Sequence, residues 1–337
     1  MTVRIAINGF GRIGRMAFRQ LYFLEEFEIV AINDITQPDL SAYLLKYDTT
    51  QGKFDMADYV DSGENYISVD DLKIPFFQEQ DASKLPWRDL NIDIVLECSG
   101  AYLSREKAQT HLNAGAKQVV LSAPAGTDIP TIVYGVNETT LSNEDTIISG
   151  ASCSTNALAP MVKVLNNYTP IQSGMMLVVH GYTATQMLQD NAQRKGNFRR
   201  SRAAADNIIP TTAEAAIAVG RVIPELNGKL IGSAVRVPVP VGCLITFTAV
   251  VMGSHITADA INKTMRSSAS QVFGYSEEEY VSSDIVGNTF AAIFDPSQTL
   301  VGKINDNEYQ VRISAWFDNE NSFVSQLVRL LQYYSNL

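Results

Sequence analysis

The first part of the chain alternates short apolar runs with stretches of helical periodicity. The predicted strands are Val3–Ile7, Phe27–Ile32, Ile92–Cys98 and Gln118–Ser122, and the predicted helices between them are Gly14–Leu24 and Ser104–Asn113. Strands and helices that alternate in this way are typical of a parallel sheet covered by helices. We therefore expect an α/β architecture in this part of the chain.

The pattern changes near Ser149, after which strand-like runs dominate. The predicted elements are a helix over Ser154–Tyr168, strands over Met175–His180, Gly232–Pro238, Cys243–Met252 and Gln310–Trp316, and a final helix over Phe323–Tyr334. Strands that follow one another without helices between them favour antiparallel pairing. This half is expected to form a second domain of α+β type with a mostly antiparallel sheet.

Composition narrows the classes of protein that the chain can belong to. Its 337 residues allow two domains, and 46% hydrophobic residues are enough to build their cores. The net charge of −10 opposes polyanions, so we expect neither nucleic acid nor an anionic membrane as a partner. Three cysteines and three histidines, without CxxC spacing, exclude a disulfide scaffold and predict no metal site.

The location of the protein is also predicted from the pattern. The N-terminus enters an apolar alternation directly, without the basic and apolar regions of a secretion signal. The longest apolar stretch, about Val239–Met252, is interrupted by Pro240 and Gly242 and is too short to span a bilayer. We expect a cytoplasmic protein.

A glycine-rich motif follows the first predicted strand. Gly9, Gly11 and Gly14 form GxGxxG at the start of a helix, where they allow a tight turn, close approach of a pyrophosphate and close helix–strand packing. Asp34 lies 20 residues after Gly14, where a carboxylate accepts hydrogen bonds from ribose hydroxyls and repels a 2′-phosphate. The motif predicts a Rossmann-type dinucleotide-binding domain that takes NAD rather than NADP.

A cysteine stands at the start of the predicted helix in the second half. Cys153 lies among Ser, Thr and Asn residues that commonly cap helices, and the positive end of the helix dipole lowers the pKa of a thiol. An inert buried thiol is the alternative, and it suits Cys98 and Cys243 on buried strands better. His180 ends an apolar strand, where it is either a structural residue or the base of a Cys–His pair. Spacing leaves both questions open.

Six segments together resemble phosphorylating, NAD-dependent glyceraldehyde-3-phosphate dehydrogenases. They are Asn8–Arg15, Ala151–Asn156, His180–Gln186, Pro224–Lys229, Arg236–Pro240 and Asp318–Glu320, and the similarity extends in matching order from Thr2 to Tyr333. The resemblance implies oxidation of glyceraldehyde 3-phosphate with NAD and inorganic phosphate to 1,3-bisphosphoglycerate through a cysteine thioester. It also implies a homotetramer, in which an irregular basic stretch, Arg194–Asp206, lies between subunits. The domains would be 1–152, completed by the C-terminal helix at 319–337, and 153–318.

The resemblance assigns roles to individual positions. Cys153 would be the nucleophile and His180 the base. The cofactor would be bound by Gly9, Gly11, Arg12, Ile13, Gly14, Asp34, Ser122 and Asn319, the last of which would hold the nicotinamide carboxamide. The substrate phosphate and the attacking phosphate would be bound by Ser152, Ser154, Thr183, Thr185, Arg200 and Arg236. If the resemblance is set aside, Thr183 and Thr185 are interpreted as structural residues and Arg200 as a solvated charge. Arg236, by contrast, lies within an apolar strand and requires an anionic partner.

The chain departs from the family pattern next to the expected phosphate site. Ala213 replaces a threonine hydroxyl and Glu214 replaces a glycine, so a carboxylate stands where the attacking phosphate would bind. We expect weak binding of inorganic phosphate for this reason. In addition, Ala157 stands where a second cysteine is common, and Asn321–Phe323 lacks a tyrosine near the nicotinamide.

Two alternative functions remain open at this stage. One is oxidation of erythrose 4-phosphate, for which a weak phosphate site would be harmless. The other is a non-catalytic, NAD-binding paralogue, although such a protein would have no need of Cys153, His180, Arg236 and Asn319 together.

Overall fold

The computed structural model describes residues 2–337, which form two compact units. Unit 1 comprises residues 2–132, 138–152 and 327–337, and unit 2 comprises residues 133–137 and 153–326. The last helix, α7 (Asn321–Tyr334), is therefore shared between them.

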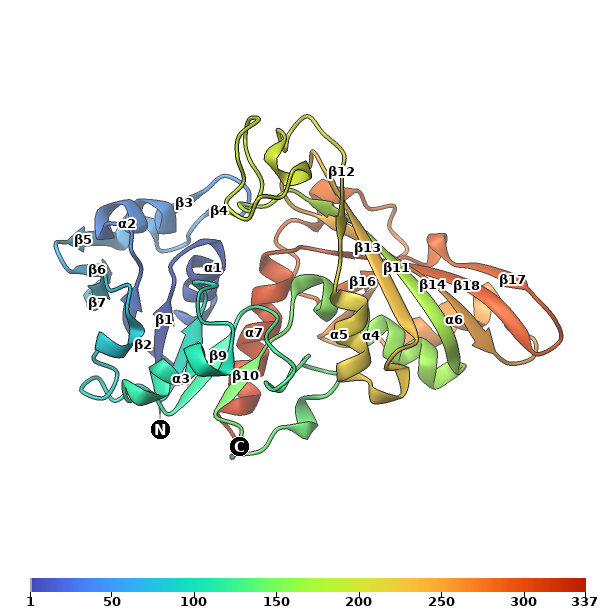
Figure 1. Cartoon of the computed structure of the whole chain (residues 1–337), viewed down its shortest axis with the longest axis horizontal. Coiled ribbons are helices and arrows are strands. Elements are labelled where there is room, and N and C mark those ends of the chain that lie inside the picture. Colours follow the sequence, from blue (N-terminus) through green and yellow to red (C-terminus); the bar gives the residue numbers. More distant parts are fainter. Residues whose placement is uncertain (1) are drawn as a thin grey trace. The chain divides into compact units, whose positions relative to one another are not determined.

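Unit 1 contains an eight-stranded sheet in the order β10-β9-β8-β1-β2-β7-β6-β5 (Figure 1). Its strands are β1 (Val3–Asn8), β2 (Phe27–Asn33), β5 (Val60–Gly63), β6 (Tyr66–Val69), β7 (Leu72–Phe77), β8 (Ile94–Glu97), β9 (Gln118–Leu121) and β10 (Ile147–Ser149). The pairs from β10 to β7 are parallel, and β7-β6-β5 form an antiparallel extension.

The helices of unit 1 connect these strands. They are α1 (Arg12–Leu21), α2 (Pro38–Lys46) and α3 (Arg105–Asn113), and a small hairpin of β3 (Tyr47–Asp48) and β4 (Gly52–Lys53) follows α2. The strands β1, β8 and β9 are almost wholly buried, as expected for parallel strands that are covered on both faces.

Unit 2 contains a second sheet in the order β12-β13-β11-β14-β18-β16-β15, and β17 pairs with β18 (Figure 1). Its strands are β11 (Ile171–Gly181), β12 (Ile209–Thr212), β13 (Leu230–Val237), β14 (Cys243–Met252), β15 (Phe273–Tyr275), β16 (Ala292–Phe294), β17 (Leu300–Lys303) and β18 (Glu308–Phe317). The pairing is antiparallel except for β11–β13 and β15–β16.

One face of the unit 2 sheet is covered by helices. These are α4 (Cys153–Tyr168), α5 (Ala215–Val222) and α6 (Ala258–Ser267); α4 contacts β11, β14 and β18, and α5 contacts β13. Side chains alternate along β11, so that Met176 and Val178 are fully buried whereas Met175 and Leu177 are exposed. On the opposite face, Met175 and Leu177 lie beside Thr248 and Thr246 of β14, so that this face carries both apolar and polar side chains.

The predicted fold class is confirmed: a parallel α/β sheet in the first part and a mostly antiparallel sheet with helices in the second. Every strand and helix that the sequence predicted is present, with ends that differ by up to four residues. The helix expected from Gly14 begins at Arg12, since the glycine turn leads directly into it. In residues 2–337 no helix combines the length and the apolar character needed to cross a membrane.

Candidate active site

The turn between β1 and α1 in unit 1 requires glycine at two positions. Gly9 has a φ of 95°, and a Cβ there would lie 2.4 Å from the Ser99 nitrogen. A Cβ on Gly14 would lie 2.1 Å from the Gly9 oxygen, so only glycine allows α1 to pack against the turn. A Cβ on Gly11 would meet no atom within 4 Å, which means that the backbone borders open space at the helix N-terminus. Such a space beside unbonded helix N–H groups suits a phosphate group.

Asp34 follows β2 and contacts the same turn. Its carboxylate accepts hydrogen bonds from the backbone N–H of Phe10, at 2.6 Å, and of Thr36, at 2.9 Å. Arg12, in the first turn of α1, forms an ion pair of 3.0 Å with Asp48. These groups lie at the carboxyl ends of parallel strands, where open α/β sheets bind their ligands.

Two further predicted cofactor residues lie in unit 1. Ile13 is a half-buried residue of α1, and Ser122 directly follows β9, where its side chain hydrogen-bonds to Cys98. The chemistry of Gly9, Gly11 and Asp34 fits a dinucleotide, as the motif predicted.

A buried polar network beneath this turn was not found by sequence reasoning. Glu97 is fully buried, and its carboxylate accepts hydrogen bonds from Ser99 and Gly100 on one oxygen and from Asn8 and His111 on the other. Because the Trp87 indole only donates, its hydrogen bond fixes His111 Nδ1 as an acceptor and leaves the proton on Nε2. The available signal was a polar residue at the end of each of three apolar strands, Asn8, Asn33 and Glu97.

The structure brings Cys153 and His180 together in unit 2. Cys153 is the first residue of α4, and His180 stands one residue before the end of β11. The Cys153 Sγ lies 3.6 Å from the His180 Nε2 and 3.9 Å from the Ser154 Oγ. Ser152 precedes the cysteine directly and is half-buried.

The other ring nitrogen of His180 has two polar neighbours. Nδ1 lies 2.7 Å from the Gly181 carbonyl oxygen and 2.7 Å from the Arg236 Nη1, which itself donates to that oxygen at 2.9 Å. The carbonyl can only accept and the guanidinium can only donate, so these two contacts favour opposite tautomers. With the proton on Nδ1, in a hydrogen bond to the Gly181 carbonyl, Nε2 presents its lone pair to the sulfur. This tautomer is the one that can remove the thiol proton.

Burial and Arg236 together keep this imidazole neutral. Burial and the Arg236 cation lower the His180 pKa to about 3. Burial also raises the pKa of the Cys153 thiol, and Arg236 opposes that increase. The expected lowering of the Cys153 pKa is therefore not found: desolvation of the thiol outweighs the Arg236 cation and the hydrogen bonds at the start of α4.

Hydroxyl and guanidinium groups gather near this pair. The Thr183 and Thr185 hydroxyls lie 2.9 Å apart, and Arg200 donates to the Thr185 hydroxyl at 3.0 Å and to the Thr211 hydroxyl at 3.3 Å. Within residues 2–337, the buried Nε atoms of Arg200 and Arg236 have no hydrogen-bond partner. Buried N–H groups without acceptors on two neighbouring cations are typical of an anion site. Thr211 was not among the predicted residues.

The remaining predicted residues of unit 2 lie on turns before helices. Ala213 and Glu214 follow β12, and Glu214 is the exposed residue that precedes α5. Asn319 is buried and precedes α7, where its side-chain oxygen accepts a hydrogen bond from the Cys243 thiol at 3.3 Å.

Comparisons with known proteins agree with this geometry. The family model described as glyceraldehyde 3-phosphate dehydrogenase, NAD binding domain, matches residues 3–105, and the C-terminal domain of the same family matches residues 152–319. Glyceraldehyde-3-phosphate dehydrogenase of Clostridium pasteurianum is 47% identical over 334 residues, 99% of both chains. That of Lactobacillus delbrueckii subsp. bulgaricus is 48% identical over 342 residues, the whole of both chains. The fold and the site define an NAD-binding oxidoreductase. The chain belongs to the glyceraldehyde-3-phosphate dehydrogenase family.

We predict that Arg236→Gln slows alkylation of Cys153. Arg236 is the cation that lowers the Cys153 pKa, so its removal raises the pKa and reduces the thiolate fraction at any pH below it. The rate of iodoacetamide labelling at pH 7, followed by mass spectrometry, should fall about tenfold, and its pH profile should move to higher pH.

The control for this experiment is Arg200→Gln, because Arg200 is not among the groups that act most strongly on the Cys153 pKa. Cys98, with a pKa of about 12, and Cys243 should remain unlabelled throughout. Equal rates in the wild type and Arg236→Gln would contradict the assignment of Arg236 as the cation that acts on this thiol.

We also predict that Glu97→Gln destabilises unit 1. Both carboxylate oxygens accept hydrogen bonds, so in either orientation the amide NH2 would face buried donors. The free energy of unfolding should fall by about 2–4 kcal/mol, measured by thermal or urea denaturation. The exposed Glu106→Gln on α3 is the control and should change it by less than about 0.5 kcal/mol. A Glu97→Gln variant as stable as the control would show that the network is not needed for folding.

Proposed function

We propose that the chain oxidises glyceraldehyde 3-phosphate with NAD and inorganic phosphate to 1,3-bisphosphoglycerate, as a glycolytic enzyme. The observation that carries the proposal is the 3.6 Å contact between Cys153 Sγ and His180 Nε2 at the start of α4. A thiol next to an oriented base is the arrangement of an activated nucleophile. The curated relatives bear the name of this activity over the full length of the chain.

In the first step, Cys153 adds to the aldehyde carbon. The thiol proton passes to the His180 Nε2, a bond forms between sulfur and carbon, and the carbonyl oxygen takes the proton back from the imidazolium. The product is a thiohemiacetal. The Nδ1 hydrogen bond to Gly181 holds the ring in the tautomer that this step requires.

In the second step, the thiohemiacetal becomes a thioester. Bound NAD would supply a hydride acceptor for the carbon that carries the sulfur. The hydroxyl proton returns to the His180 Nε2, where the imidazolium lies close to the reacting oxygen. Inorganic phosphate then attacks the carbonyl carbon, the carbon–sulfur bond breaks, and the sulfur recovers a proton from His180.

The anion-binding groups of unit 2 would hold the phosphates of both substrates. Thr183, Thr185 and Arg236 would bind the phosphate of the triose, and Ser152 and Ser154 would bind the attacking phosphate. Arg200, which joins Thr185 to Thr211 of β12, would contribute to both. The buried Nε atoms of the two arginines support this proposal, because a phosphate would satisfy them.

The cofactor would be bound mainly by unit 1, which we assign as the dinucleotide-binding domain. Gly9, Gly11, Arg12, Ile13 and Gly14 would surround the pyrophosphate, Asp34 would hold the adenosine ribose, and Ser122 would contact the cofactor from the end of β9. Asn319 of unit 2, the catalytic domain, would bind the nicotinamide carboxamide.

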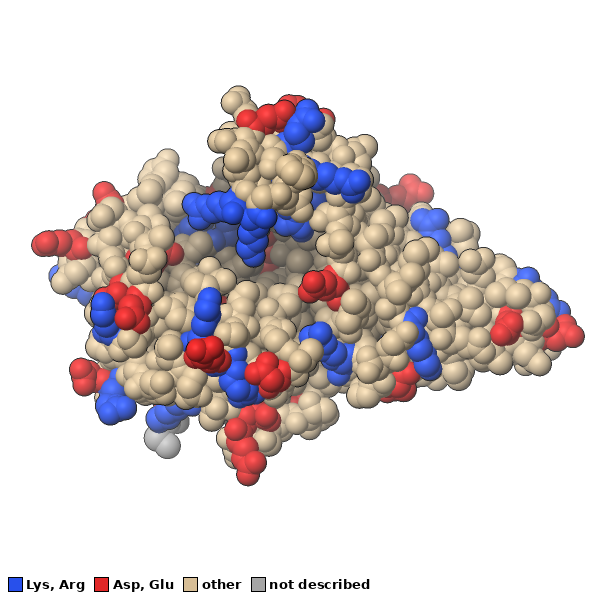
Figure 2. Space-filling model, viewed as in Figure 1, with Lys and Arg blue, Asp and Glu red and all other residues tan. Residues whose placement is uncertain are grey.

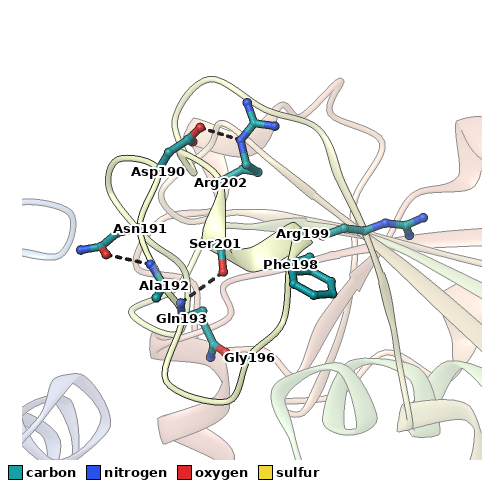
Figure 3. Close-up of a pocket in the computed structure, with 9 residues that line it drawn as sticks. All are labelled: Asp190, Asn191, Ala192, Gln193, Gly196, Phe198, Arg199, Ser201 and Arg202. Carbon is teal, nitrogen blue, oxygen red and sulfur yellow. Dashed lines mark hydrogen bonds and ion pairs between the residues drawn. The ribbon is translucent and has the colours of Figure 1, made fainter.

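We propose a homotetramer in the cytoplasm as the working form. Met175, Leu177 and Ile231 lie in adjacent positions on the open face of the unit 2 sheet, and their exposure of 40–64% suits burial against a second copy. The loop between β11 and β12 is a second such surface: Phe198, next to Arg199, is 91% exposed, and the same loop contains the Asp190–Arg202 ion pair (Figure 3). Several Lys and Arg side chains, with a few acidic ones beside them, lie around this loop (Figure 2).

The decisive measurement is NADH formation by the purified chain with glyceraldehyde 3-phosphate as inorganic phosphate is raised from zero. Sustained turnover should require phosphate, and Cys153→Ser should abolish it because the serine hydroxyl is a far weaker nucleophile. The same assay with erythrose 4-phosphate separates the two aldehydes. NADH formation that is faster with erythrose 4-phosphate and independent of phosphate would favour the four-carbon substrate, and no turnover of either would favour a binding protein.

We predict that Glu214 raises the KM for inorganic phosphate. A unit charge about 4 Å from another costs about 1 kcal/mol in water, which is roughly a fivefold change in affinity. The double variant Ala213→Thr, Glu214→Gly should therefore lower the phosphate KM at least fivefold. The exposed Glu225→Gly is a control for the loss of one negative charge. An unchanged phosphate KM in the double variant would refute the effect.

A further inference from the structure

Cys243 links two parts of the proposed active site through one sulfur atom. It is the first residue of β14 and is fully buried. Its sulfur accepts a hydrogen bond from the Gly181 N–H at 3.3 Å and donates one to the Asn319 side-chain oxygen at 3.3 Å. Neither the glycine motif nor the Cys–His pairing pointed to this residue, which the sequence suggested was an inert core thiol.

The Gly181 end of this link is the peptide that orients the base. The Gly181 carbonyl accepts hydrogen bonds from His180 Nδ1 and from Arg236, while its N–H is held by the sulfur. A Cβ on Gly181 would lie 2.7 Å from the Val239 oxygen, so the backbone here packs closely against the segment after β13. The sulfur is therefore attached to a fixed point.

At the Asn319 end, the sulfur fixes the orientation of the side-chain amide rather than the position of the backbone. The backbone is held by Asp318, whose carboxylate accepts hydrogen bonds from the N–H groups of Glu320, Asn321 and Gly287 at 2.8 Å. The side-chain amide has one oxygen acceptor and one NH2 donor group. Within residues 2–337, Cys243 takes the oxygen, and the amide nitrogen makes no hydrogen bond.

The thiol can serve as this donor at any working pH. Burial, together with the nearby Cys153, raises the pKa of Cys243 well above that of an ordinary thiol, so the S–H proton is retained. With its oxygen turned towards the buried thiol, Asn319 has its NH2 group left as the unbonded side-chain group that it can offer to a ligand.

We propose that Cys243 is a positioning residue that turns the Asn319 amide so that its NH2 group faces the carbonyl oxygen of the nicotinamide carboxamide. The proposal rests on the function above, in which Asn319 binds that carboxamide. Through Gly181, the same sulfur ties the amide to the peptide that orients His180. The orientation of the cofactor and the orientation of the base would thereby both depend on the buried sulfur of Cys243.

The test compares Cys243→Ser with Cys243→Val. Serine keeps a donor and an acceptor but loses volume, whereas valine keeps the volume but can neither donate nor accept. If the thiol positions the amide, the KM for NAD should rise about fivefold in Cys243→Val and stay within about twofold of the wild type in Cys243→Ser. The KM for glyceraldehyde 3-phosphate should change by less than twofold in both.

Thionicotinamide adenine dinucleotide gives a second readout. Its sulfur is a weaker acceptor than the carboxamide oxygen, so the wild type should prefer NAD. Cys243→Val should lose most of this preference, because the amide donor is no longer fixed. Ile245→Val, a buried change two residues along β14 that removes no polar contact, should retain it.

Binding of NAD to the full chain, measured by calorimetry, tests the proposal without turnover. The proposal is overturned if Cys243→Val binds NAD as tightly as the wild type, or if Cys243→Ser loses as much affinity as Cys243→Val. Cys243→Ala takes the place of the valine variant should the latter not fold. A wild type that binds NAD but oxidises no aldehyde would overturn the proposed function and leave this comparison of affinities valid.

Discussion

The carbonyl oxygen of Gly181 determines how the Cys–His pair can work. It accepts hydrogen bonds from both the His180 Nδ1 and the Arg236 guanidinium. Without this acceptor, the arginine would donate to Nδ1 instead, and the proton would move to Nε2, where it would block removal of the thiol proton. The Gly181 carbonyl thus favours the tautomer that leaves Nε2 free to accept the thiol proton, whereas the equally close Arg236 N–H favours the other one.

Arg236 has opposite effects on the charged forms of Cys153 and His180. Its charge lowers the pKa of the thiol and also lowers the pKa of the imidazole, so it favours the thiolate and disfavours the imidazolium. Burial acts against the charged form of both. A negatively charged substrate beside Arg236 would relieve part of this penalty and make the imidazolium easier to form. The base would then become stronger when the anion is bound, which suits a reaction whose substrates are phosphates.

The sequence predicted those parts of the molecule whose cause is local. The glycine turn, the apolar strands and the start of α4 follow from conformational freedom, periodicity and capping at neighbouring positions. Cys153 and His180 were candidates from their elements, but spacing along the chain left their contact open, since it depends on β11 lying beside the N-terminus of α4. The expected direction of the Cys153 pKa shift failed for the same reason. The position of a residue at a helix start can be predicted locally, whereas its burial depends on the whole fold.

Residues that position other side chains were the hardest to predict from the sequence. Glu97 and Cys243 each lie at one end of an apolar strand. Apart from Ser99 and Gly100 beside Glu97, their partners come from distant segments that nothing nearby in the sequence indicates. Both obey one physical rule: a buried polar atom needs hydrogen-bond partners, and these hydrogen bonds then hold the partners in place. Glu97 gathers donors and so holds the loop after β8 against the β1 strand end. Cys243 both accepts and donates a hydrogen bond. It therefore connects the Gly181 peptide, next to the base His180, with the Asn319 amide that is proposed to bind the cofactor. The interior of each unit thereby sets the geometry of its ligand-binding edge.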